Sequence, residues 1–155
     1  MGVQEGDDEL MADFQDINPE LAIYNLIVAN TTLTALLATY STAPAVFFSS
    51  RVPEDATYPY IWCPGRVGTE ITDTKDQIGE SFLLDLMVVI EQTGSTKILQ
   101  QITRILKATL HRQATTLTGG NHVGSLVSGP VPAPLTEDLV GTVLTLEYEF
   151  FECPN

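Results

Sequence analysis

Residues 81–91 read SFLLDLMVVIE, and this stretch decides the fold. Its hydrophobic residues occupy most positions on both alternating faces of an extended chain. One face carries Phe82, Leu84, Leu86, Val88 and Ile90. The opposite face carries Leu83, Met87 and Val89 beside Asp85 and Glu91. Because both faces are largely apolar, we predict a strand at the centre of a sheet.

Residues 139–151 form the second clear strand pattern. Leu144, Leu146, Tyr148 and Phe150 are expected to face inward. Thr145, Glu147 and Glu149 alternate with them and are expected to face outward. The two glutamates therefore indicate a face that is either solvated or in contact with a partner.

Three weaker strands are predicted at residues 46–49, 59–67 and 123–131. Pro64-Gly65 interrupts the second of them. Since proline cannot donate a hydrogen bond to a neighbouring strand, we expect this strand to lie at an edge or to bulge there.

Helices are predicted before and between the strands. Asn18-Pro19-Glu20 is a helix start, with a capping residue, a proline in the first turn and an acid after it. Asn30 can cap a second short helix. Ser95 is expected to cap a helix over residues 96–110. The apolar stripe of that helix comprises Ile98, Leu99, Ile102, Ile105, Leu106 and Leu110.

This order of elements predicts an α+β fold. We expect a mainly antiparallel sheet of four to five strands, with N-terminal helices and one central helix packed on it. The 155 residues suit a single domain. Residues 1–18 are expected to form an acidic N-terminal extension, and residues 19–155 the domain itself.

The chain is strongly acidic, with a net charge of −13 and a pI near 4.2. This charge disfavours binding to nucleic acid or to anionic membranes, both of which require clustered Lys and Arg. The first nine residues are acidic and polar, unlike a secretory signal. We therefore expect the chain to stay in the cytoplasm in which it is made.

We predict no catalytic residues, no cofactor and no metal site. His111 and His122 lack metal-ligand spacing and are interpreted as surface histidines. Cys63 and Cys153 are expected to be free thiols, although a disulfide between them remains an alternative. No glycine motif that binds phosphate occurs.

Three segments are predicted to contact partner proteins: the polar stretch 68–80, the basic residues 97–112 and the acidic N-terminal extension. The polar stretch 68–80 is expected to be a long loop between paired strands, and such loops commonly make contacts. Four of the seven basic residues cluster at Lys97, Arg104, Lys107 and Arg112, which suggests either a solvated helix face or a contact for acids of a neighbouring copy. The candidate interface residues are Thr69, Glu70, Thr72, Asp73, Lys75, Asp76, Lys97, Arg104, Lys107, Asp7, Asp8 and Phe14.

A series of short motifs runs through the middle of the chain. It comprises Val46-Phe47-Phe48, Arg51-Val52-Pro53, Tyr58-Pro59-Tyr60-Ile61 and Gly65. With the flanking helices and strands, this series resembles the tail terminator family of long-tailed bacteriophages and gene transfer agents, also called tail completion or minor tail proteins. The resemblance spans about residues 19–152, whereas the acidic extension departs from it.

The resemblance implies a structural virion protein of the tail and neck. Such proteins form a hexameric ring that caps the tail tube, ends its polymerisation and joins the tail to the head. The implied partners are copies of the chain itself, the tail tube protein and the head–tail connector. Genomic DNA would pass through the acidic lumen without specific binding.

Three other functions remain open from the sequence. The first is a head-completion or connector protein of the same neck region. The second is a small cytoplasmic enzyme or enzyme subunit, and the third is a monomeric acidic inhibitor of a host protein.

Overall fold

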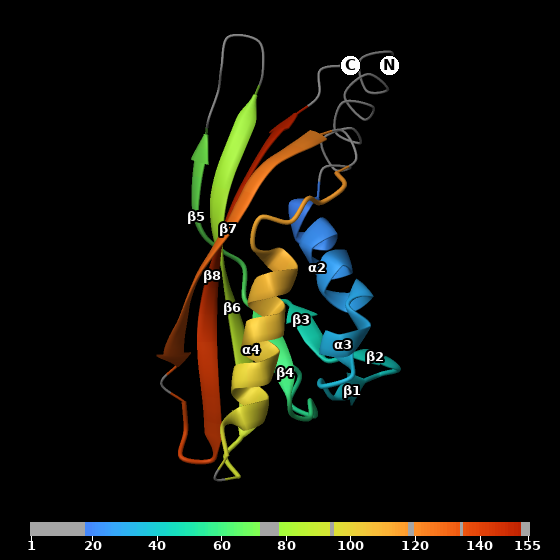
Figure 1. Cartoon of the computed structure of the whole chain (residues 1–155), viewed down its shortest axis with the longest axis vertical. Helices are drawn as coiled ribbons and strands as arrows, with labels where there is room; N and C mark the ends of the chain where they lie inside the picture. Colours follow the sequence, from blue (N-terminus) through green and yellow to red (C-terminus); the bar gives the residue numbers. More distant parts are fainter. Residues whose placement is uncertain (1–17, 72–77, 94, 118–119, 134, 153–155) are drawn as a thin grey trace, which may run out of the picture.

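The protein is a two-layer domain in which helices cover one face of a sheet (Figure 1). The computed structural model describes residues 18–71, 78–93, 95–117, 120–133 and 135–152. The helices are α2 (Pro19–Ala29), α3 (Thr31–Thr34) and α4 (Lys97–Leu110). The strands are β1 (Thr39–Tyr40), β2 (Ala43–Pro44), β3 (Val46–Phe48), β4 (Tyr60–Cys63), β5 (Arg66–Ile71), β6 (Gly79–Glu91), β7 (Gly120–Ala133) and β8 (Leu139–Glu152).

The main sheet has six strands in the order β3-β4-β6-β8-β7, with β5 also paired to β6. All neighbours are antiparallel except β3 and β4, which run parallel. β6 and β8 pair along the whole of β6, from Gly79 opposite Phe151 to Glu91 opposite Leu139. The predicted α+β class with a mainly antiparallel sheet is confirmed, and β6 lies at its centre as expected.

The sheet gains an extra strand at Pro64-Gly65. These residues divide the predicted strand 59–67 into β4 and β5, and Gly65 has φ +137°, a conformation that favours glycine. β4 pairs with the second half of β6 and β5 with its first half. The predicted loop 68–80 is correspondingly wrong at both ends, because residues 68–71 belong to β5 and residues 79–80 to β6.

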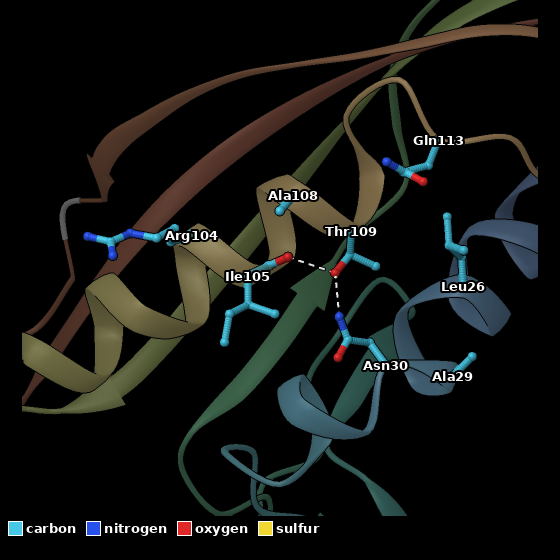
Figure 2. A pocket seen from close by; sticks show the side chains of 8 residues that line it. All are labelled: Leu26, Ala29, Asn30, Arg104, Ile105, Ala108, Thr109 and Gln113. Carbon is cyan, nitrogen blue, oxygen red and sulfur yellow. Dashed lines mark hydrogen bonds between the residues drawn. The ribbon is translucent and has the colours of Figure 1, made fainter.

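Asparagine side chains begin the first two helices, as predicted. Asn18 Oδ1 accepts a hydrogen bond from Leu21 N at 3.0 Å, and Asn30 Oδ1 accepts one from Leu33 N at 3.1 Å. Asn30 Nδ2 also donates to Thr109 Oγ1 at 2.8 Å, which ties the end of α2 to α4 (Figure 2). Asn30 therefore links the two helices that lie side by side on the sheet.

Two details of α4 differ from the prediction. The N-cap is Thr96, and Ser95 Oγ accepts only a long bond of 3.4 Å from Lys97 N. Ile98 is 50% exposed, whereas the predicted stripe placed it in the core. Ile98 lies in the first turn and at the flank of the apolar stripe, so it projects beyond the sheet.

The main core lies between the helices and the sheet. The even-numbered positions of β6 and β8 fill it, with Phe82, Leu84, Leu86, Tyr148 and Phe150 among its members. A second, smaller cluster around Ala45, Tyr60 and Val89 covers the opposite face at the β3–β4 end. The described residues therefore cover both faces of the sheet at that end.

No helix in the described parts of the chain is long and apolar enough to cross a membrane.

The fold predicts a sharp contrast between neighbouring positions of β6. Leu86 is fully buried between the sheet and the helices, so Leu86→Ala should lower the free energy of unfolding by about 2–5 kcal/mol. Leu83 lies on the opposite face and is 37% exposed, so Leu83→Ala should cost less than about 1 kcal/mol. Urea denaturation of both variants checks this, and equal losses would contradict the assigned faces.

Candidate protein interface

The face of the sheet that points away from the helices, here called the outer face, is open over β6, β8 and β7. Leu83 on β6 and Leu126 on β7 are each opposite Glu147 on β8. The two leucines are 37% and 48% exposed, and Glu147 is also exposed. We call these three side chains the docking row. The row thus places one carboxylate between two partly exposed leucines on an open strand face.

Along β5, β6, β7 and β8, the described charged side chains on the outer face are all negative. Glu149 lies next to the docking row along β8, and Asp85 lies on the other side of it along β6. Asp85 Oδ1 accepts a hydrogen bond from Thr145 Oγ1 at 2.8 Å. Glu70 on β5 shares this face because it is opposite Ser81. The outer face therefore combines apolar side chains with carboxylates.

The opposite side of the molecule is the helix layer, and it carries basic residues. Lys97 and Arg104 lie on the exposed side of α4, two turns apart. Lys107 lies at the flank and donates from Nζ to the Gly129 carbonyl at 2.9 Å. Of these three candidates, Lys97 and Arg104 thus lie on the exposed side while Lys107 is partly held by β7.

A shallow, open depression of about 580 Å³, here called the groove, lies between α2 and α4 (Figure 2). Its walls are largely apolar and include Leu26 and Ala29 from α2 and Ile105 and Ala108 from α4. Arg104 lies at one end and points away from the groove over the surface of α4 (Figure 2). Ion pairs within the described ranges involve Arg66 and leave Arg104 unpaired.

Arg66 links β5 to both layers of the domain. Its Nε donates to Glu20 Oε1 at 2.5 Å, and its Nη1 pairs with Glu80. The guanidinium lies over the Phe82 ring, with Cζ 4.1 Å from the centroid. Burial lowers the pKa of Arg66, but the two carboxylates outweigh it and raise the pKa above its usual value.

A stack of rings continues from Phe82 across the sheet. The Phe82 and Tyr148 centroids are 5.3 Å apart, and the Tyr148 and His122 centroids 4.3 Å apart with nearly parallel planes. Tyr148 also hydrogen-bonds Thr115 through its hydroxyl, and burial raises its pKa. Arg66 and three rings thus connect four neighbouring strands, β5, β6, β8 and β7.

The prediction of surface histidines is wrong for His122. Its ring is stacked on Tyr148, and its Nδ1 accepts a hydrogen bond from Thr115 N at 3.0 Å. Burial lowers its pKa, since a buried imidazole is less readily protonated. His111 is half-buried, and its Nδ1 accepts from Val127 N at 3.0 Å. Both rings therefore accept hydrogen bonds from loop or strand backbone.

Residues with metal or nucleophile chemistry do not converge in the described ranges. No group of three His, Cys, Asp or Glu side chains is placed to hold a metal ion there. Cys63 is a free, buried thiol whose pKa burial raises to about 11. A thiol in this state is a poor nucleophile at neutral pH.

The sequence-predicted interface residues fall into separate places. Thr69 and Glu70 are exposed on β5 in the sheet layer, whereas the basic candidates lie on α4 in the helix layer. Several candidates lie outside the described residues, namely Asp7, Asp8, Phe14, Thr72, Asp73, Lys75 and Asp76. The sequence pattern does not indicate the docking row or the groove. It does place Glu147 on the outward face, because Glu147 alternates with inward-facing residues.

The fold has a counterpart among solved structures. No family model and no curated protein sequence matches the chain. A chain from the virion of a native gene transfer agent particle superposes with a TM-score of 0.70 and 17% sequence identity. The match covers 84% of this chain and 92% of the other. At this identity, the likeness shows a shared fold over nearly the whole domain.

Arg66 should stabilise the domain by holding Glu20 and Glu80 together over Phe82. We expect Arg66→Met to lower the free energy of unfolding by about 1–3 kcal/mol, because it removes the cation–ring contact and leaves two carboxylates close together. High salt should reduce this loss by screening their repulsion. Arg51→Met, in an exposed loop, is the control and should change stability by less than about 0.5 kcal/mol.

His122 should make stability depend on pH. Its folded-state pKa lies below the unfolded value of 6.5, so the unfolded chain takes up the proton first. Stability is therefore complete above that value and falls as the pH drops through it, until the folded-state pKa is reached. Between about pH 7.5 and 5.5, where carboxylates stay largely ionised, His122→Gln should show a smaller fall in urea denaturation than the wild type. Identical pH profiles would contradict this role.

Proposed function

We propose that the chain is a structural protein of a phage-like virion that forms a ring at the head-proximal end of the tail. In this role it caps the tail tube, ends tube polymerisation and joins the tail to the head. It acts by docking to other proteins and not by catalysis. Its partners are copies of itself, the tail tube protein and the connector of the head.

The observation that carries this proposal is the shared fold with a chain of a gene transfer agent virion. The match covers 84% of this chain and 92% of the other. The Val46–Phe48, Val52-Pro53 and Pro59-Tyr60 motifs, which resemble tail terminators, lie on β3, β4 and the loop joining them. Two independent kinds of similarity thus favour the same class of particle.

The surface of the domain suits assembly into a ring. In a ring, each subunit presents one patch to the copy before it and a different patch to the copy after it. This domain has two such patches on opposite sides, an acidic and apolar outer face and a basic helix layer. A symmetric dimer would require only one self-complementary patch.

The charge of the chain suits a conduit for DNA. Six copies at −13 each would carry a total charge of −78. Carboxylates along the lumen of such a ring would repel the phosphates and let the genome slide through without being held. This is the opposite of a nucleic-acid binding site, which needs clustered cations.

The rival role is a head-completion or connector protein on the other side of the same neck. Both roles use small ring-forming virion proteins, and they differ in which partner the ring contacts.

Electron micrographs of particles made without this protein separate the two roles. Loss of a tail terminator should give overlong tails that are not joined to heads, because nothing stops the tube from growing. Loss of a connector should give free tails of normal length together with heads that leak DNA. Particles of normal appearance would exclude both roles.

A further inference from the structure

The two sides of the domain carry side chains of opposite charge. We propose that the docking row of one copy, Leu83–Glu147–Leu126, packs against the groove between α2 and α4 of the next copy, with Glu147 paired to Arg104. This assignment rests on the proposed ring and specifies the contact that would build it. It also identifies the outer face of the sheet as the surface that the basic side chains of α4 contact in the next copy.

The docking row has an apolar–acidic–apolar pattern across three strands. Glu147 lies between Leu83 and Leu126 in register, so the carboxylate is flanked by a leucine on each side. Neighbouring strands are about 4.8 Å apart, and the row therefore spans about 10 Å. The row projects from a rigid sheet, since β6 and β8 are paired along their full length.

The groove is similar in width to the row, and its cation lies at one end. Two helices packed side by side have axes about 8–10 Å apart. Leu26, Ala29, Ile105 and Ala108 supply an apolar surface against which one leucine of the row can pack while Glu147 lies at the end of the groove. Arg104 lies at the end of the groove and points outward, where an incoming carboxylate can reach it.

Charge favours a second copy over another partner. A chain with seven basic and twenty acidic residues repels its own copies unless cations lie at the contact. The described part of the outer face carries Glu147, Glu149, Asp85 and Glu70 without a basic side chain, whereas α4 concentrates Lys97, Arg104 and Lys107. Docking the outer face onto α4 thus places scarce cations against the carboxylates of the neighbour.

The geometry of the contact makes it self-propagating. The docking row lies on one side of the sheet and the helices cover the other side (Figure 1). Each copy can therefore contact one neighbour through its row and another through its groove. A contact between two different patches closes into a ring or continues as a filament.

Charge reversal tests the proposed pair, with self-association measured by sedimentation and mass photometry of the full chain. Glu147→Arg places two arginines in contact, and Arg104→Glu places two glutamates in contact. Each variant alone should weaken self-association by roughly 30-fold or more, because like charges then meet at the interface. Both sites are exposed, so circular dichroism should show that both variants remain folded.

Mixing the two variants supplies the decisive measurement. In an alternating ring, the arginine introduced by Glu147→Arg in one copy meets the glutamate introduced by Arg104→Glu in the next. The following junction restores the natural pair of Glu147 with Arg104. A one-to-one mixture should therefore assemble to the wild-type size, whereas neither variant does so alone. Glu137→Arg and Arg51→Glu change the net charge by the same amounts at other exposed sites and should assemble as the wild type does.

The outcomes separate this contact from the ring itself. If the wild type assembles and the single variants assemble equally well, the ring stands and the proposed contact is wrong. If the single variants fail and their mixture also fails, Glu147 and Arg104 do not pair across the junction. A wild-type chain that stays monomeric at its highest soluble concentration would overturn both the contact and self-assembly of the ring.

Discussion

The pairing of β6 with β8 along their full length is the interaction on which the rest of the structure depends. It sets the register that sends Leu84, Leu86 and Tyr148 into the main core and leaves Leu83 and Glu147 on the outer face. A shift of one residue would exchange the two faces, exposing the core side chains and burying a glutamate. The rest of the main sheet is built on this pair: β4 and β5 attach to the free edge of β6, β7 attaches to that of β8, and β3 follows β4. The two surfaces assigned to neighbouring copies are therefore consequences of a single register.

The scarcity of basic residues gives each one a distinct use. Arg66 makes its contacts within the domain, with Glu20, Glu80 and the ring of Phe82. Arg104 has no such partner within the described residues and points outward. In a chain with net charge −13, an unpaired cation on a helix creates a local site of opposite sign. The same residue type thus stabilises the fold at one position and is available for assembly at the other.

The sequence was sufficient for the parts of the fold whose signal is local. The alternation in β6 and β8 and the helical stripe of α4 identified central strands and a covering helix, because burial imposes a period on contiguous residues. The sequence predicts the division between β4 and β5 only in part. Pro64-Gly65 indicates an interruption, but not that β4 and β5 pair with different parts of β6. His122 was misjudged because stacking on Tyr148 depends on the register of β7. The groove and the Arg66 contacts join residues that are far apart in sequence, which no periodicity can reveal.

The anchoring of α2 has a mechanical consequence. This helix buries Pro19, Ile23 and Ile27, and its Tyr24, Leu26 and Val28 pack partly buried against the core. Polar contacts fasten it at both ends, with Glu20 tied to Arg66 on β5 and Asn30 tied to Thr109 on α4. Helix α2, which forms one wall of the groove, is thus held by a polar contact at each end. The contact of Glu20 joins it to a strand at the edge of the sheet. A protein that bound β5 and displaced Arg66 from Glu20 would make α2 more mobile, and the groove that α2 forms with α4 would then bind the adjoining subunit less well.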